Sequence, residues 1–200
     1  MKAIITGDII NSREGNVLQW LESLKTILQK YGKEPKQWEI YRGDSFQLVI
    51  PPQDAILVAF HIKACIKQTK NYDVRIGLGL GEETYSAQKI TESNGEAYVN
   101  SGECFEKLKK QTLAIRSNNS EFDNTINLML SIILLTANNW SNIVSEAIKT
   151  SIEHPNKHQK EIAKLLKKSQ SSISEALKRG GYEEILKINK FYQTQLSNLW

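Results

Sequence analysis

Two glycine–aspartate pairs, Gly7-Asp8 and Gly43-Asp44, are the residues whose types and spacing best suit chemistry in this 200-residue sequence. Asp8 follows a short apolar run, and Asp44 lies between two runs that contain aromatic and apolar residues. If these runs are neighbouring strands, the two carboxylates meet at one edge of a sheet. Carboxylate oxygens suit Mg²⁺ or Mn²⁺, which in turn bind the phosphates of a nucleotide. The glycines would let such a ligand approach the backbone.

Simpler interpretations exist for each of these residues. Gly-Asp is a favoured turn dipeptide, so Asp44 could only shape a hairpin turn, and Asp8 could cap the loop that follows its strand. Arg42 and Arg75 are candidate phosphate contacts, but each could be a solvated strand residue. His61 lies among apolar residues at helical spacing, and we expect it to be a packed core residue rather than a ligand.

A second candidate site lies near the C-terminus, in residues 159–179. Apolar residues at helical spacing predict two short helices that face each other, and Ser169 is a suitable N-cap for the second helix. The exposed face of that helix would carry side chains that can hydrogen-bond base edges and phosphates. These side chains are Gln170, Ser171, Ser172, Ser174, Lys178 and Arg179. The alternative is an amphipathic helical hairpin with no role in DNA binding.

The distribution of charge favours nucleic acid as a partner of this segment. The whole chain carries 26 Lys and Arg against 22 Asp and Glu, a net charge of +4 that is too small to be informative. Between residues 154 and 182, however, seven basic side chains stand against only Glu161 and Glu175. DNA is therefore the first partner to test.

The elements that would position Asp8 and Asp44 follow from residue patterning. Strand patterns are predicted over residues 2–9, 38–42, 45–50, 73–80 and 112–115, and helical patterns over residues 16–31, 55–69 and 97–110. The order β-α-β-β-α-β, followed by a helix and a strand, matches a ferredoxin-like layout with helices on one face of a mainly antiparallel sheet.

Everything after about residue 118 is predicted to be helical. The polar residues 118–124 are interpreted as a linker, so the chain divides into domains 1–118 and 119–200. Helices are expected over residues 123–137, 140–152 and 183–192; the first two either complete a core or pair with a second subunit. Gly180-Gly181 leaves room for a short wing. The predicted fold class is thus α+β, a ferredoxin-like sheet domain followed by an all-α helix-turn-helix domain.

Composition and targeting patterns narrow the cellular setting. Cys65 and Cys104 are the only cysteines and have no Cys/His cluster near them, which argues against a zinc site or a disulfide framework. The most apolar run, residues 128–135, is shorter than the roughly 20 residues of a membrane helix. The N-terminus has no pattern of a signal peptide. We therefore expect a cytoplasmic protein.

Four short motifs resemble the catalytic domains of class III nucleotide cyclases: residues 7–12, residues 41–46, residues 74–81 and Val99-Asn100. The resemblance implies that Asp8, the carbonyl of Ile9, and Asp44 bind metal ions over a triphosphate. It also suggests nucleotide contacts from Gly7, Gly43, Arg42, Arg75 and Asn100.

Two positions depart from the cyclase pattern. Ile40 replaces a base-selecting lysine, and Cys104 replaces an arginine that stabilises the transition state. Because the loss of such a stabiliser costs on the order of 10²–10³ in rate, the departures argue against cyclase turnover. Metal–nucleotide binding or another phosphate chemistry remains open.

Residues 159–179 resemble the helix-turn-helix of many bacterial regulators, although Lys167 and Lys168 replace the customary residues of the turn. The combination of both halves resembles the SatD family, with the strongest matches in residues 1–12 and 41–46. Three hypotheses follow. The first is a DNA-binding regulator, expected to be a homodimer, whose front domain senses a nucleotide. The second is a metal-dependent cyclase or phosphotransferase, and the third is an adaptor for protein contacts.

Overall fold

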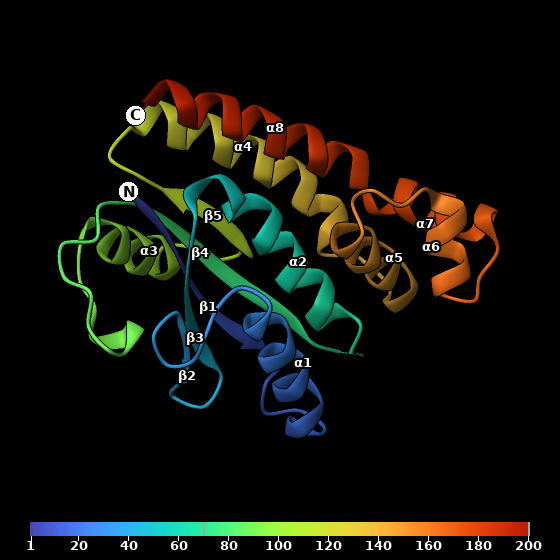
Figure 1. The fold of residues 1–200 in the computed structure, drawn as a ribbon, viewed down its shortest axis with the longest axis horizontal. Helices are drawn as coiled ribbons and strands as arrows, with labels where there is room; N and C mark the ends of the chain where they lie inside the picture. Colours follow the sequence, from blue (N-terminus) through green and yellow to red (C-terminus); the bar gives the residue numbers. More distant parts are fainter. Residues whose placement is uncertain (70, 200) are drawn as a thin grey trace.

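The computed structural model describes residues 1–69 and 71–199, with side chains as far as Ser197. Its sheet contains β1 (Lys2–Ile10), β2 (Trp38–Tyr41), β3 (Ser45–Ile50), β4 (Asp73–Gly81) and β5 (Leu113–Arg116). The strand order is β2-β3-β1-β4-β5, and the β4–β5 pair is parallel while the other pairs are antiparallel. The described residues also form α1 (Val17–Gln29), α2 (Ala55–Lys67), α3 (Glu96–Glu106), α4 (Ser120–Ala137), α5 (Asn142–Glu153), α6 (Gln159–Leu165), α7 (Gln170–Gly180) and α8 (Tyr182–Leu199). The class is α+β with a mixed five-stranded sheet, as Figure 1 shows.

The two faces of the sheet are covered by different helices. On β1, Ala3 and Ile5 belong to the large core that includes α1 and α2, whereas Ile4 packs with Ala97 of α3 in a separate cluster. The expectation of helices on one face therefore holds for α1 and α2 but is wrong for α3. The physical reason lies in β4: a Cβ on Gly79 would come within 2.2 Å of the Ala97 carbonyl oxygen, so the bare strand admits the α3 backbone.

The predicted linker over residues 118–124 is wrong, because most of it forms the start of α4. The Asn119 side chain caps this helix by accepting a hydrogen bond from the Phe122 amide at 2.9 Å. The Asp123 carboxylate accepts hydrogen bonds from the amide and the hydroxyl of Ser117, at 2.8 and 2.7 Å. These polar side chains stop one element and start the next, which is the usual role of Asn and Asp beside a helix.

The helices after β5 pack onto the front half rather than standing apart. The rings of Phe60 on α2 and Trp140 have centroids 6.2 Å apart, and the Tyr192 hydroxyl of α8 donates to the Pro52 carbonyl at 2.6 Å. One hydrophobic core runs from β1 to α8. In Figure 1, α4 and α8 lie side by side along one edge, and α5, α6 and α7 form one end. This shared core gives no independent support for two separate domains. The division at residue 118 stays a prediction.

The described helices include none with the length and apolar character needed to cross a membrane. Even α4, with 18 residues and a mostly apolar sequence, is polar at its first turn, where Glu121 and Asp123 lie.

Candidate functional site

Asp8 and Asp44 lie at the same edge of the sheet, as their spacing predicts. Asp8 is in register with Ser45 of β3 on one side and with Arg75 of β4 on the other. Asp44 directly precedes Ser45, and its carbonyl accepts a hydrogen bond from the Ile9 amide at 3.2 Å. The antiparallel β1–β3 pairing therefore brings together two residues that are 36 positions apart in the sequence.

Arg75 holds the Asp8 carboxylate with two hydrogen bonds. Its Nε donates to one carboxylate oxygen at 3.0 Å, and its Nη2 donates to the other. The guanidinium also lies over the Phe105 ring, 5.4 Å from its centroid. The hydrogen bonds to Asp8 raise the pKa of Arg75. Asp44 is held by Ser12, whose hydroxyl donates to its carboxylate.

This arrangement does not fit a divalent cation without rearrangement. Both oxygens of Asp8 face a guanidinium, and a hard cation such as Mg²⁺ needs those oxygens free. Among the residues that the structure describes, no group of three or more His, Cys, Asp or Glu side chains could hold a metal ion. A metal role for Asp8, Ile9 and Asp44 stays a prediction, and it would require Arg75 to move away.

A pocket of about 390 Å³ opens beside Asp8 and Arg75. Residues 109–112 form its far wall, and the side chains of Lys109 and Lys110 are exposed there. With Arg75, three cationic residues border the pocket against one carboxylate, a balance that suits an anionic ligand. Sequence reasoning missed this wall because it extended the helix to residue 110. In fact α3 ends at Glu106, and Lys109 takes a positive φ of 46° in the following turn.

The glycines predicted to approach a nucleotide have different surroundings. A Cβ on Gly7 would come within 2.6 Å of the Phe46 ring, so the space at Gly7 is filled by a side chain of the core. Gly43 has a φ of +93° and open space around it, at the tip of the β2–β3 turn. Arg42 is exposed in the same turn. The turn thus leaves Gly43 and Arg42 accessible to a ligand beside Asp44. Gly7 is buried and is not accessible to a ligand.

Asn100 and Cys104 both lie on α3, and Asn100 is away from the carboxylate pair. Asn100 donates to the Leu80 carbonyl at 2.8 Å and accepts from Arg116 at 3.3 Å, near the end of β4 opposite to Arg75. Burial raises the pKa of the Cys104 thiol to about 12, so this position carries no charge toward a phosphate at neutral pH. The structure therefore brings together Asp8, Asp44 and Arg75 but not Asn100.

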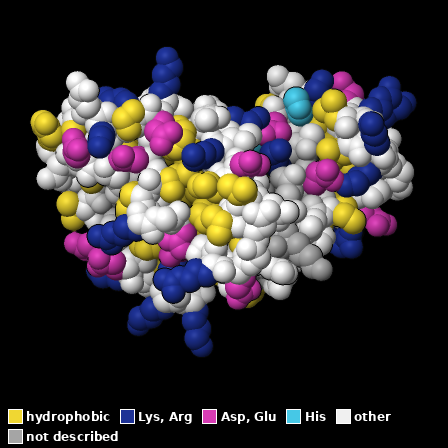
Figure 2. Space-filling model, turned by 90° about the horizontal axis from the view of Figure 1, so that it is seen from below, with side chains coloured by type: hydrophobic (Ala, Val, Ile, Leu, Met, Phe, Trp, Pro, Cys, Tyr) yellow, Lys and Arg dark blue, Asp and Glu magenta, His cyan; other side chains and the backbone are white. Residues whose placement is uncertain are grey.

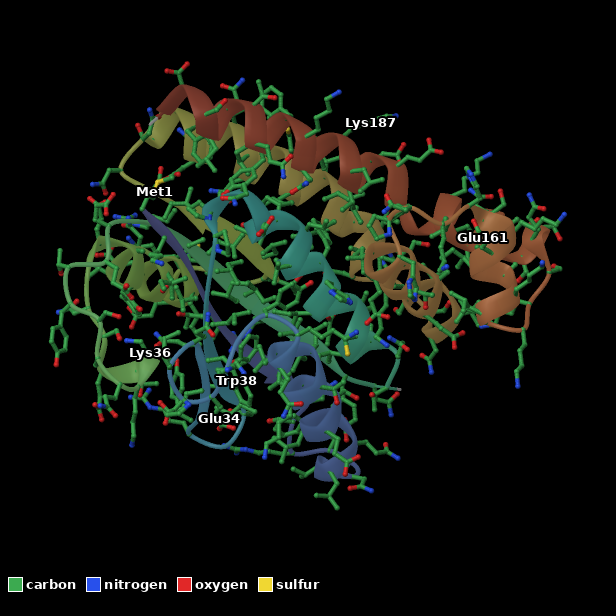
Figure 3. The ribbon with its side chains drawn as sticks, viewed as in Figure 1. Met1, Glu34, Lys36, Trp38, Glu161 and Lys187 are labelled. Carbon is green, nitrogen blue, oxygen red and sulfur yellow. The ribbon has the colours of Figure 1, made fainter. Side chains whose placement is uncertain are left out.

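The second candidate site is the hairpin of α6 and α7 at the end of the molecule. Five of the residues predicted to face inward are buried, and the sixth, Leu166, is half-buried; the five are Ile162, Ala163, Ile173, Ala176 and Leu177. Ser169 caps α7 by accepting from the Ser172 amide at 3.1 Å, as predicted. Lys167 takes a φ of +51°, the left-handed conformation that usually favours glycine in such a turn. Figure 3 shows where this hairpin lies: Glu161 of α6 is on the opposite side of the molecule from Met1 of the front half.

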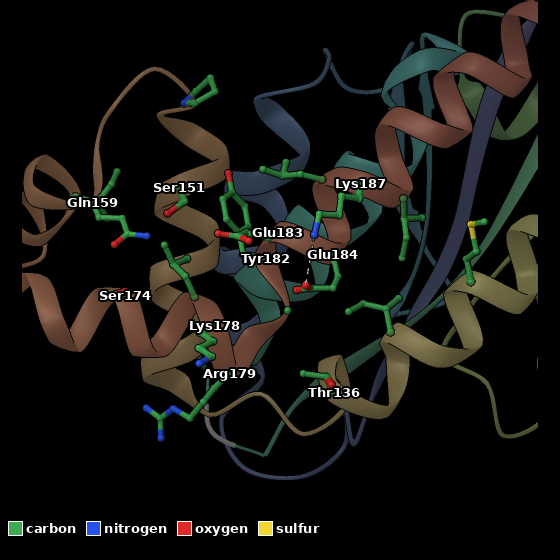
Figure 4. A pocket seen from close by; sticks show the side chains of 18 of the residues that line it. Thr136, Ser151, Gln159, Ser174, Lys178, Arg179, Tyr182, Glu183, Glu184 and Lys187 are labelled. Carbon is green, nitrogen blue, oxygen red and sulfur yellow. Dashed lines mark ion pairs between the residues drawn. The ribbon is translucent and has the colours of Figure 1, made fainter.

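The outer face of α7 is accessible. Gln170, Ser171, Ser174, Lys178 and Arg179 are exposed, and Ser172 is half-buried. Figure 2 shows Lys and Arg side chains projecting at this end of the molecule. Ser174, Lys178 and Arg179 border a groove of about 1260 Å³ against α4 and α8, seen in Figure 4, whereas Gln170 and Ser171 lie outside its lining.

Between α7 and α8, the described residues leave no room for the short wing expected at Gly180-Gly181. Gly181 ends α7 with a φ of +67°, and α8 begins at Tyr182. A Cβ on Gly181 would lie 2.7 Å from the Ile133 side chain, and the Trp140 indole donates to the Gly180 carbonyl at 2.9 Å. Close packing at both glycines turns the chain directly into α8, so Gly180-Gly181 is a helix junction.

Comparison with known families assigns the chain. The model of the SatD family matches residues 2–196, which is nearly the whole length. The chain therefore belongs to the SatD family, as its opening residues and its first hairpin predict. No curated protein matches it by sequence.

Proposed function

We propose that this protein is a DNA-binding transcriptional regulator that reads DNA with α7. The observation that carries the proposal is the α6–α7 hairpin, in which a capped, exposed helix projects from the end of the molecule. Recognition helices contact base edges mainly through their N-terminal residues, and Gln170 and Ser171 occupy that position. The finer fold assignment belongs to this proposal: the hairpin supports a helix-turn-helix, and the β2-β3-β1-β4 order supports a ferredoxin-like front part.

The electrostatics of this end of the molecule support DNA as the partner. Lys157, Lys160, Lys164 and Lys167 are all exposed around α6, next to Lys178 and Arg179 of α7. Lysine and arginine side chains contact phosphates and hold the protein on the duplex, while amide and hydroxyl groups read the bases. A positive surface around a helix with Gln and Ser at its N-terminus combines both kinds of contact.

Filter binding with genomic fragments at two salt concentrations tests the proposal. We expect binding that weakens steeply with salt, and a smaller salt dependence when Lys178→Ala is combined with Arg179→Ala. A matched control combines Lys25→Ala with Lys190→Ala, which removes two exposed positive charges elsewhere and should leave binding nearly unchanged. Binding without salt sensitivity, or an equal loss in both double variants, would contradict the proposal.

A second test separates specific from non-specific binding. Gln170→Ala should relax the sequence preference of the selected fragments and cost about 1–3 kcal/mol for the preferred site, with little effect on other DNA. Competition between the selected fragment and unrelated DNA measures this difference. An unchanged preference in the Gln170 variant would place recognition elsewhere.

We further propose that the front pocket binds a phosphate-bearing ligand such as a nucleotide. The observation that favours this function is the cationic pocket between Arg75 and Lys109–Lys110. Thr112 of the pocket wall donates to the Asn138 side chain at 2.6 Å, and Lys67, which lies outside the pocket lining, donates to the Asn138 carbonyl at 2.8 Å. Because Asn138 ends α4, these bonds offer a physical connection from the pocket to the helical half.

Calorimetric titration with each nucleoside triphosphate, with and without Mn²⁺, tests this second proposal. We expect binding that is lost when Lys109→Ala is combined with Lys110→Ala and retained when Lys33→Ala is combined with Lys36→Ala. Product analysis of the same mixtures tests the alternative of a cyclase or phosphotransferase. Turnover that disappears in Asp44→Ala would favour the enzyme over the sensor, and no binding by any nucleotide would contradict the sensor.

A further inference from the structure

Helix α4 carries an exposed stripe that none of the described side chains covers. Its inward residues are buried in the core, but Leu128, Ile132 and Leu135 are 63%, 61% and 75% exposed. Spacings of four and three residues place them in one line along the helix surface. A helix that is apolar on both faces is typical of a protein interior. Contact between this outer face and water is therefore unfavourable.

The stripe continues with polar residues at both ends. Asn124 is exposed four positions before Leu128, and Asn139 is exposed four positions after Leu135. No charged residue occurs between Asp123 and Glu146. The order along the stripe is therefore amide, three apolar side chains, amide, and this order is the same in both directions.

We propose that the partner of this face is the α4 stripe of a second copy of this chain, in an antiparallel pair related by a two-fold axis. A symmetric interface joins the same surface on both copies, so the surface must complement itself. With the axis near Ile132, Leu128 lies opposite Leu135 of the second copy. Asn124 then lies opposite Asn139 of the second copy, so apolar groups meet apolar groups and amides meet amides.

The groove next to the stripe gives the second copy further surface to contact. Its apolar lining includes Met129, Ile133, Ile188 and Phe191, and it shares Ile132 with the stripe. At about 1260 Å³ it is larger than the roughly 300–1,000 Å³ of small-molecule sites, and it matches about three turns of helix. Figure 4 shows Lys187 and Glu184 beside it, charged side chains of the kind found at the rim of an interface.

The area available is adequate for a stable pair. Helix α4 has 18 residues and is about 27 Å long, and together with the flank of α8 it forms a strip about 20 Å wide. The flat footprint of about 540 Å² per copy gives about 1,080 Å² for the pair, which clears the roughly 1,000 Å² expected of a biological interface. Gln170 and Ser171 lie outside the groove, so the pairing leaves the start of α7 free on both copies.

Sedimentation equilibrium without DNA tests the pairing independently of the proposed function. We expect the wild-type chain to form a dimer at micromolar concentration, and Ile132→Glu with Leu135→Glu to raise the dissociation constant at least about 100-fold, because both charges would be buried in an apolar interface. The control Leu18→Glu alters an equally exposed leucine, 62% exposed on α1, and should leave the dimer intact. Circular dichroism of the variants checks that they remain folded.

Cysteine cross-linking tests the antiparallel register. Ile132→Cys should form a disulfide-linked dimer under mild oxidation, because the two Cα atoms near the axis lie within reach of a disulfide. Asn124→Cys should not link to itself but should link to Asn139→Cys in a mixture of the two variants. A wild-type monomer at high micromolar concentration, a dimer insensitive to the glutamates, or Asn124→Cys chains that link to themselves would overturn the proposal. So would a monomer that native mass spectrometry shows to carry a small molecule or another protein on this face.

Discussion

His61 is predicted to make the folding stability depend on pH in a range where most side chains do not titrate. The imidazole is 2% exposed, and it contacts the Tyr31 hydroxyl through Nδ1 while its Nε2 lies 3.3 Å from the Glu153 carboxylate. Burial lowers the pKa of His61 from 6.5 to about 4, although Glu153 opposes this shift. The folded protein therefore holds a neutral imidazole at neutral pH.

The sign and size of the effect follow from proton linkage. A base whose pKa is lower in the folded state binds fewer protons there, so stability is lost as the pH falls below 6.5 and the loss is complete near pH 4. Between pH 7 and pH 5 the loss amounts to about 2 kcal/mol. Burial raises the pKa of Glu153 while Lys30 and Lys149 lower it, and the net direction is downward, so Glu153 loses its contribution only below pH 4.5.

Urea unfolding at pH 7 and pH 5 measures this loss. The His61→Gln variant cannot titrate at this position, so its stability should fall by about 2 kcal/mol less than that of the wild type over the same interval. His158→Gln changes an exposed histidine of the α6 N-terminus and should keep the wild-type dependence. Equal pH dependence in the wild type and His61→Gln would refute the reasoning.

Three further predictions concern packing, capping and buried charge, each measured by urea unfolding. Gly79→Ala should cost about 3 kcal/mol because its Cβ would strike the α3 backbone, whereas Gly102→Ala on α3, with open space around it, should be neutral or slightly stabilising. Ser169→Ala should cost about 1 kcal/mol by removing the cap of α7, and a silent change would mean that the cap is unimportant. Asp73→Asn should cost about 3 kcal/mol, because Lys63 is 2% exposed and depends on that carboxylate at 2.7 Å; Asp73→Glu should recover part of the loss.

The boundaries of most elements could be predicted because their signals are local. Alternating or helical spacing of apolar residues locates β1, α2 and β4 within two residues of their ends. The prediction of a linker over residues 118–124 was wrong because Asn, Ser and Asp favour both loops and helix N-termini. Only the structure shows that Asn119 bonds to Phe122 and so begins a helix.

The candidate site was predictable in part. The hairpin at Asp44 and the strand at Asp8 place the two carboxylates together through a single antiparallel pairing. The capture of Asp8 by Arg75 was not predictable, because it depends on the register between residues 67 positions apart. The same holds for Lys109 and Lys110, which reach the pocket only because α3 ends early.

By itself the sequence determined the family, the α+β class and the inward and outward faces of α6 and α7, since each follows from short-range patterns that a helix or strand imposes on neighbouring residues. The tertiary structure alone decided which groups meet across long separations. It set a guanidinium against Asp8, filled the space at Gly7 with Phe46, and left one face of α4 exposed. These outcomes depend on strand register and on the distance between packed helices, which no local pattern encodes.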